Sequence, residues 1–304
     1  MNLSTGIAFK NLKSENGIVI EGDIQKKCQK VLLSISEDII TVFEEENYWY
    51  QLGGGTALGA VRHHGFIPWD DDMDINVKSK DFEKIGLAIE NKYRGKYKFL
   101  YYNVPDYGQP MGRIMLKNSI YRDRESYNSD HCGFFIDIFP IVNVPDNAII
   151  RKIHGHLCMI SGGLTSCRKF FKNRKLYLLI AKENPEIKKT IYMKLFIGAA
   201  ISFISLKTCA RITNLIYGLC KNENSKYVSF PSGRKHYFGE MYRREGMIET
   251  IPVDFEGHQW QVAKDFDNYF TVLYGPDYMI PHSPEKREKH ILLELKFPDE
   301  MPEK

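Results

Sequence analysis

Several features that the sequence lacks narrow the class of protein. No internal repeat or low-complexity run occurs in its 304 residues, so neither a repeat architecture nor a low-complexity protein is expected. Within residues 151–221, the longest run without Asp, Glu, Lys, Arg or His is 195–206, whose 12 residues fall short of the ~20 needed to span a bilayer. Residues 1–16 contain no apolar core of a secretory signal. Six cysteines without paired spacing are typical of reduced thiols, so we expect a cytoplasmic protein.

Acidic residues are scarce between residues 151 and 221. This block contains 14 Lys and Arg but only two Asp and Glu, a net charge of +12, whereas the rest of the chain has 28 basic and 36 acidic residues, a net charge of −8. Such a block favours a negatively charged partner: an anionic membrane leaflet, a phosphorylated glycan or nucleic acid. Apolar residues recur in it at helical spacing, so we predict several basic amphipathic helices. We interpret 195–206 as core, with an interfacial membrane helix as the alternative.

The most informative stretch covers residues 51–76 and contains three consecutive glycines. The apolar run 48–52 predicts a short buried strand, and the glycines 53–55 break it where backbone N–H groups can approach a ligand closely. We expect Thr56 to cap a short helix over 57–62, whose N-terminus favours a phosphate. The predicted phosphate-binding residues of this cradle are Gly54, Gly55 and Thr56.

An acidic segment follows the cradle after a turn at 65–68. We predict a strand on which Asp70, Asp72 and Asp74 share one face, because side chains of a strand alternate between its two faces. Three like charges repel, and a divalent cation that bridges Asp72 and Asp74 removes the repulsion. Hard oxygen ligands suit Mg²⁺ or Mn²⁺. The alternative is an acidic surface turn, but apolar residues between the acids favour burial and hence metal-assisted phosphoryl transfer.

These residues resemble the signature of LicD-family phosphotransferases. That family lies in the nucleotidyltransferase-fold superfamily, whose pattern is Gly-Gly or Gly-Ser at a helix start followed by Asp-x-Asp on the next strand. Weaker similar blocks occur at residues 134–140, 254–257 and 273–279. The resemblance covers about residues 30–145 and 230–292, and the block between them is not recognisable.

The resemblance implies that Asp72 and Asp74 are the metal-binding pair and that a third carboxylate lies on a later strand. Asp137 fits that role, because it sits among large apolar residues and a buried carboxylate must be paired or bound to a metal. It would hold one metal and could accept the proton of the acceptor hydroxyl. The alternative is a structural Asp that accepts bonds from a neighbouring Arg or from the backbone. The predicted catalytic and metal-binding residues are Asp72, Asp74 and Asp137.

Basic residues near the cradle are the remaining candidates. Arg62 and His63 end the cradle helix and can reach a phosphate or the leaving group, whereas Arg113 falls on a predicted strand that could line the same cleft. A solvated surface position is the alternative for Arg113. Three residues after a Pro-Ser-Gly turn could close over a phosphate or lie at the surface: Arg234, Lys235 and His236. In the C-terminal tail, Arg287 and His290 resemble family positions without an assigned role.

Other patterns predict the framework around these residues. The alternation of His154, His156 and Cys158 suggests metal ligands, but their region is expected to be helical and has no obvious fourth ligand, so zinc is not favoured. The remaining predicted elements are a helix over 24–47 capped by Asp23, a helix capped by Ser79, strands at 97–102, 112–116 and 133–139 with the last closed by Pro140, and a helix over 258–274 ended by Gly275 and Pro276.

We therefore expect an α/β (α+β) fold with a nucleotidyltransferase-like mixed sheet and flanking helices. The expected parts are a catalytic core (1–145), a basic helical insertion (146–225) and a C-terminal part that completes the catalytic unit (226–304). The resemblance implies an Mg²⁺- or Mn²⁺-dependent transfer of phosphocholine, or a related alcohol phosphate, from a CDP-activated donor. The acceptor would be a hydroxyl of a cell-surface glycan or glycolipid.

Two alternatives remain open at this point. One is a nucleotidyltransferase that transfers NMP from an NTP and releases pyrophosphate. The other is a non-catalytic module that binds membranes through its basic block. Peripheral contact of 151–221 with the inner face of a membrane is compatible with either reading, whereas nucleic acid is not the favoured partner.

Overall fold

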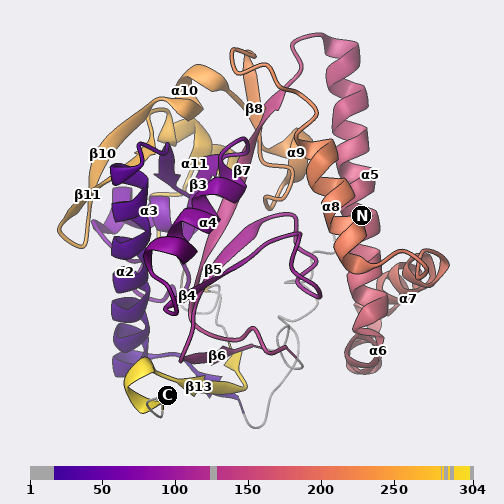
Figure 1. The fold of residues 1–304 in the computed structure, drawn as a ribbon, viewed down its shortest axis with the longest axis horizontal. Coiled ribbons are helices and arrows are strands. Elements are labelled where there is room, and N and C mark those ends of the chain that lie inside the picture. Colours follow the sequence, from indigo (N-terminus) through magenta and orange to yellow (C-terminus); the bar gives the residue numbers. More distant parts are fainter. Residues whose placement is uncertain (1–16, 124–128, 282, 284–286, 288–290, 302–304) are drawn as a thin grey trace.

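A curled mixed sheet forms the centre of the protein (Figure 1). The computed structural model describes residues 17–123, 129–281, 283, 287 and 291–301. In this part of the chain the sheet has seven strands: β2 (Tyr50–Leu52), β3 (Asp74–Lys78), β7 (Phe135–Val144), β5 (Gly112–Leu116) and β4 (Tyr97–Leu100) in that order, with β8 (Tyr227–Ser229) and β9 (Met241–Arg243) continuing beside β7. The central strands β3 and β7 are parallel, and β2 and β5 flank them in antiparallel orientation. The expected mixed α/β fold is confirmed.

Helices from the first part of the chain cover this sheet. They are α2 (Gly22–Glu45), α3 (Gly54–His63) and α4 (Phe82–Lys92). Helix α2 buries Leu32, Ile35 and Ile39 among others, because apolar residues three and four apart lie on one helical face. Two predicted caps were wrong. Helix α2 begins before Asp23 and is preceded by Glu21, and α4 begins after Asp81 rather than after Ser79.

Strand β7 continues through Pro140, which we had expected to end it. The N–H group of Asp137 donates to the carbonyl of Met73 on the β3 side, so alternation directs the missing N–H of Pro140 to the opposite side. On that side the pairing with β5 stops at Ile138 and the pairing with β8 starts at Val142. The proline therefore stands where no hydrogen-bond donor is required.

The predicted basic helices form one layer on the side of the molecule away from α2 (Figure 1). They are α5 (Ala148–Lys172), α6 (Arg174–Glu183), α7 (Pro185–Ala200) and α8 (Leu206–Tyr217). The side chain of Asn147 caps α5, accepting from the backbone N–H groups of Ile149 and Ile150. The uncharged run 195–206 spans the end of α7, the turn after it and the first residue of α8. Its interpretation as core was wrong, because Phe196 and Phe203 are largely exposed. None of the helices among the described residues is long and apolar enough to cross a bilayer.

The candidate zinc ligands on α5 have other environments. His154 is buried, and its two ring nitrogens lie 3.1 Å from the hydroxyl of Tyr237 and 2.9 Å from the carbonyl oxygen of Ile216. Burial lowers the pKa of His154, which favours the neutral ring. His154 is thus engaged by Tyr237 and Ile216, and His156 is exposed to solvent while Cys158 is buried.

The C-terminal part contains a hairpin that we had predicted as helix. Residues 258–263, which include Trp260 and Val262, form strand β11 (His258–Ala263), paired with β10 (Thr250–Phe255). Glu256 and Gly257 join the strands with φ angles of 51° and 85°, as a tight hairpin turn requires. The helix itself, α11 (Phe266–Tyr274), is shorter and ends before Gly275 as predicted. The remaining elements are α9 (His236–Gly239), α10 (Arg244–Ile248), β1 (Ile18–Val19), β6 (Ile120–Arg122), β12 (Ile291–Leu292), β13 (Glu294–Lys296) and the 3-10 turn η2 (Pro298–Glu300).

Candidate active site

Three charged side chains lie in one row across the centre of the sheet. Asp74 on β3 is the register partner of Asp137 on β7, and Asp137 is the register partner of Arg113 on β5. Partners in register project their side chains to the same face of a sheet. Residues 24 and 63 positions apart are therefore neighbours, as the resemblance had implied for the two carboxylates.

The glycine run lies directly against the acidic residues. A Cβ atom at Gly54 would stand 2.6 Å from Oδ2 of Asp74, and one at Gly55 would stand 2.8 Å from Oδ2 of Asp70. Any larger residue would displace these carboxylates, and Gly54 also adopts a φ of +46°. The glycines thus allow carboxylates to approach the start of α3.

Thr56 does not cap the helix, contrary to our prediction. Helix α3 begins at Gly54 with Gly53 in the cap position, and Thr56 lies inside the first turn. Its buried hydroxyl accepts a hydrogen bond of 2.9 Å from the backbone N–H of Asp74. The hydroxyl therefore fixes the helix to the start of β3, where the row of charges begins.

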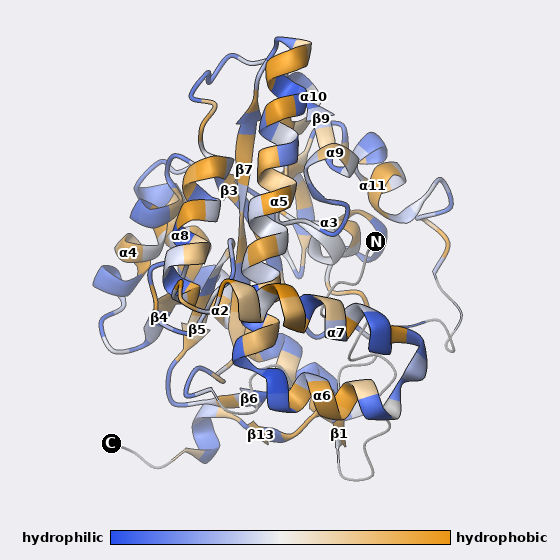
Figure 2. Ribbon diagram, turned by 90° about the vertical axis from the view of Figure 1, so that its right-hand side faces the viewer, coloured by the Kyte–Doolittle hydropathy of each residue, from blue (hydrophilic) through white to orange (hydrophobic). Residues whose placement is uncertain are grey.

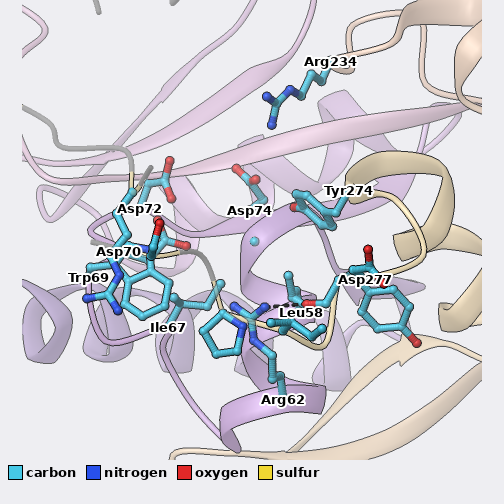
Figure 3. Close-up of a pocket in the computed structure, with 16 residues that line it drawn as sticks. Leu58, Arg62, Ile67, Trp69, Asp70, Asp72, Asp74, Arg234, Tyr274 and Asp277 are labelled. Carbon is cyan, nitrogen blue, oxygen red and sulfur yellow. Dashed lines mark hydrogen bonds between the residues drawn. The ribbon is translucent and has the colours of Figure 1, made fainter. Parts of the chain in front are cut away.

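A cavity of about 770 Å³ opens beside this row, and we call it the outer cavity. Asp70, Asp72 and Asp74 line it together with Gly55, so the acids share one side as predicted, although only Asp74 belongs to β3 (Figure 3). The fourth acid, Asp71, is buried elsewhere and accepts a hydrogen bond of 2.5 Å from the hydroxyl of Tyr121.

The carboxylates of the outer cavity oppose one another's ionisation. Burial, followed by repulsion from Asp72, raises the pKa of Asp70 well above its ordinary value. Burial also raises the pKa of Asp74, and the charges of Asp72 and Asp137 add to it. A site that concentrates negative charge in this way favours either protons or a bound cation.

Asp137 has a cationic partner within the sheet. The guanidinium of Arg113 donates two hydrogen bonds to it, from Nε to Oδ1 (2.7 Å) and from Nη2 to Oδ2 (3.1 Å). Burial opposes the charged form of Arg113, but the attraction of Asp137 raises its pKa overall. Within the residues that the structure describes, no group of three or more His, Cys, Asp or Glu side chains is arranged to hold a metal ion. The sheet therefore brings Asp137 beside Asp74 but engages it with Arg113.

The other predicted phosphate ligands differ in their access to the cavity. Arg62 lines the outer cavity opposite Asp74, and its Nη1 donates a hydrogen bond of 2.5 Å to the carbonyl of Tyr278 (Figure 3). His63 instead stands edge-on to the ring of Trp69, with 6.2 Å between ring centres. Burial lowers the pKa of both Arg62 and His63.

The C-terminal part completes the wall of the outer cavity. Arg234 points toward Asp74, and Tyr274 stands beside that carboxylate (Figure 3). Arg234 thus reaches the site, whereas the amine of its neighbour Lys235 donates to the carbonyl of Val272. The guanidinium of Arg287 lies 3.9 Å from the centre of the Trp69 ring, at the edge of the cavity. His290 lies outside the described residues. Sequence reasoning missed Tyr274 as a cavity residue, although it lies in the block at 273–279.

A glycine-led helix start next to carboxylates on adjacent sheet strands is the arrangement expected of the nucleotidyltransferase fold. Residues 47–155 match the family model described as "LicD/FKTN/FKRP, nucleotidyltransferase domain". This region therefore matches a nucleotidyltransferase domain of the LicD type, and the resemblance inferred from the glycine and aspartate motif is confirmed by that match.

Individual phosphotransferases also match the chain, one over most of its length and others over a short segment. The chain is 27% identical over 278 residues to the lipopolysaccharide cholinephosphotransferase LicD of Haemophilus influenzae, with 88% of this chain and 96% of that protein covered. It is 37% identical over 54 residues to the ribitol 5-phosphate transferase FKRP of mouse and human, which covers 18% of this chain and 11% of FKRP. These comparisons support a LicD-like phosphotransferase.

Proposed function

We propose that the protein is a metal-dependent phosphotransferase that moves phosphocholine, or a related alcohol phosphate, from a CDP-activated donor to a hydroxyl of a cell-surface glycan or glycolipid. The observation that carries this proposal is the crowding of Asp70, Asp72 and Asp74 beside the glycine-led start of α3. The volume of the outer cavity, about 770 Å³, falls within the range of small-molecule sites. The cholinephosphotransferase named among the relatives supports the type of group transferred.

Asp72 and Asp74 would hold Mg²⁺ or Mn²⁺ in this proposal. The fit rests on the donor set, which consists of hard carboxylate oxygens, and on the mutual repulsion that raises the pKa of Asp70 and Asp74. When bound, such an ion stabilises negative charge on the attacking and leaving oxygens of a phosphoryl transfer. Asp137 would complete the carboxylate set while Arg113 holds its orientation. Both oxygens of Asp137 accept hydrogen bonds from Arg113, so proton acceptance by Asp137 is not part of the proposal.

The remaining residues would orient the donor. The backbone at Gly55 borders the outer cavity at the N-terminal end of α3, where a helix favours a phosphate. Arg62 and Arg234 face the cavity from opposite sides, so they could bind the two phosphates of a CDP-alcohol between them (Figure 3). Release of CMP would follow attack of the acceptor hydroxyl on the phosphorus that carries the alcohol.

Analysis of products tests this function against the nucleotidyltransferase alternative. The protein is incubated with Mg²⁺, a glycan acceptor and either labelled CTP or labelled CDP-choline. We expect release of CMP from CDP-choline and no pyrophosphate from CTP. Pyrophosphate formation would establish the nucleotidyltransferase, and the absence of both products with a panel of CDP-alcohols and acceptors would favour a non-catalytic module.

A further inference from the structure

A second, smaller cavity of about 200 Å³ lies behind Asp74, and we call it the inner chamber. Asp74, Gly55, Arg234 and Tyr274 line both cavities, so the two spaces meet at the row of charges. The inner chamber is about a quarter of the volume of the outer cavity, about 200 Å³ against about 770 Å³. We therefore assign the larger nucleoside part of a donor to the outer cavity and its smaller alcohol end to the inner chamber.

Aromatic rings surround the inner chamber. Phe139 projects from β7, Phe230 follows β8, and Tyr269 and Tyr274 belong to α11. The rings of Phe230 and Tyr269 lie 6.2 Å apart between centres, and the Tyr269 hydroxyl is fixed by a hydrogen bond of 2.9 Å from the N–H of Gly54. Faces of aromatic rings attract cations, most of all quaternary ammonium groups.

A carboxylate stands among these rings. Glu240 is only 3% exposed, and its Oε1 accepts a hydrogen bond of 2.6 Å from the backbone N–H of Lys235. Among the described residues, no lysine or arginine side chain lies within ion-pair distance of Glu240. Burial raises the pKa of Glu240 to about 7, although the Lys235 N–H and the charges of Lys235 and Arg234 oppose this. Burying an uncompensated carboxylate is costly, so the position favours a cationic ligand.

We infer that the inner chamber binds the alcohol part of the donor, and that Glu240 and the four rings select a quaternary ammonium alcohol over a neutral polyol. This inference rests on the proposed function. Arg234 lies at the junction of the two cavities, where the donor's phosphate would neutralise its charge. The ammonium group would then lie beyond the phosphate, against Glu240 and the faces of Phe139 and Phe230.

Calorimetric titration of the full-length protein with Mg²⁺ tests this selection. We expect CDP-choline to bind about tenfold more tightly than CDP-glycerol or CDP-ribitol, since a desolvated cation–π and carboxylate contact is worth about that factor. Glu240→Gln keeps the hydrogen bond from Lys235 but removes the charge, and it should remove most of the preference. Phe139→Leu, at a half-buried position, should weaken CDP-choline alone. The matched control is Glu249→Gln, because Glu249 is paired with Lys264 at the surface.

The possible results of the titration distinguish failure of this inference from failure of the proposed transferase function. Equal affinity for all CDP-alcohols, or a preference that Glu240→Gln and Phe139→Leu leave unchanged, overturns the inference while the transferase proposal stands. Tighter binding of CDP-glycerol or CDP-ribitol would assign the inner chamber to a polyol instead. Failure of the unmodified protein to bind any CDP-alcohol would overturn both.

A separate observation concerns the outer surface of the helical insertion. Ile150, Ile153, Leu157, Ile160 and Leu164 recur three or four residues apart along α5 and are all exposed, Ile153 by 56% and Ile160 by 59%. This spacing places them in one stripe, which we call the apolar stripe. The neighbouring α8 exposes Ile212 and Leu215, and Leu219 is exposed just after it. Figure 2 shows α5 and α8 side by side, both with hydrophobic stretches.

Positive charge accompanies these apolar residues. Lys152 and Arg211 are exposed next to Ile153 and Ile212 in the sequence, and residues 151–221 carry a net charge of +12. Exposed apolar side chains within a basic surface match the interface of an anionic bilayer, where acyl chains and acidic headgroups meet. We propose that the face formed by α5 and α8 docks on the surface of an anionic membrane.

Co-sedimentation with lipid vesicles tests the docking face independently of catalysis. The full-length protein should bind vesicles that contain phosphatidylglycerol, bind phosphatidylcholine vesicles weakly, and dissociate as salt rises. Ile153→Ser with Ile160→Ser, and separately Lys152→Glu with Arg211→Glu, should each lower binding about tenfold or more. Leu87→Ser is the control, because Leu87 is 44% exposed on α4, outside this face. Binding that is absent, or equal in all variants, overturns the proposal. The molecular mass in solution is measured as well. If the unmodified protein is a dimer and the stripe variants are monomers, the proposal is also overturned and the face belongs to a second copy.

Discussion

In the sheet core, the carboxylate of Asp74 lies beside other carboxylates, whereas in the helical insertion the buried polar side chains of α5 and α8 are neutral and bonded to neutral partners. Asp74 is flanked by Asp72 and Asp137, and its pKa is raised. In the insertion, Thr165 and Thr213 are both buried and their hydroxyls lie 2.8 Å apart. Unrelieved electrostatic repulsion is a property of sites that bind a ligand, whereas satisfied neutral pairs serve packing. The comparison therefore assigns chemistry to the core, and the insertion's charges to its outer surface.

The largest expected effect follows from removing one charge of the core. Asp74→Asn should lower turnover by about 10³-fold, because it removes a proposed metal ligand worth several kcal/mol in the transition state. The fold should persist, since the backbone N–H of Asp74 keeps its bond to Thr56 and a repelled carboxylate disappears. Turnover and thermal unfolding are measured together, with Asp23→Asn on the exposed first turn of α2 as control. Full activity of Asp74→Asn would remove the metal assignment.

A second effect concerns the charge pair of the row. Arg113→Met should destabilise the fold by about 3 kcal/mol, because it leaves Asp137 partly buried without its bidentate partner and removes a contact with the ring of Phe135. Adding Asp137→Asn should restore part of that stability but not the activity. Urea unfolding and turnover of the two single variants and the double variant form the measurement. Simple additivity of the two single effects would show that the pair contributes no coupling.

Glu240 provides a third test, through pH. Its pKa is about 7 in the folded protein against an ordinary value of 4.5, so between these values the unfolded chain has lost a proton that the folded protein retains. Stability therefore falls as pH rises from 4.5 to 7, by about 2–3 kcal/mol from this group. Glu240→Gln has no such titration. As the pH rises from 4.5 to 7, the free energy of unfolding of the variant should therefore increase relative to that of the unmodified protein. Arg234, Lys235 and Asp74 also act on Glu240, so the comparison with the Gln variant isolates its own titration. A constant difference from pH 5 to 8 would contradict the burial of its charge.

Sequence alone was sufficient for the parts of the site that lie close together in the chain. The glycines at 53–55 and the acids at 70–74 are close in sequence and flank α3 and the start of β3, so their proximity was predictable, although Asp70 and Asp72 precede the strand and Thr56 does not cap the helix. The position of Asp137 beside Asp74 was implied by the family resemblance, whereas its pairing with Arg113 matches the structural alternative that the sequence had left open. The basic insertion was predicted from its charge and helical periodicity, because both are local properties.

The rest depends on distant contacts that no local pattern contains. The chain offers 18 Tyr and 18 Phe as candidates for an aromatic site, and only the return of the chain after the insertion brings Phe230, Tyr269 and Tyr274 together with Phe139. Trp260 was assigned to a helix because its apolar neighbours fit both periods, and the turn at Glu256 and Gly257 decides for a strand. Pro140 is tolerated in β7 only because its neighbours leave a gap.

The smallest expected effect belongs to the neutral pair of the insertion. Thr165→Val should cost about 1 kcal/mol, because it leaves the buried hydroxyl of Thr213 without its partner. Thr165→Val with Thr213→Val should cost less than the single variant, since no polar group then remains unsatisfied and the shape of the side chains is kept. Urea unfolding measures both variants, and turnover should not change in either. The distinction between the two regions would not hold in either of two cases. The first is a loss of unfolding free energy in Thr165→Val as large as that in Arg113→Met. The second is a fall in turnover in Thr165→Val, because the insertion's polar pair would then be coupled to the site.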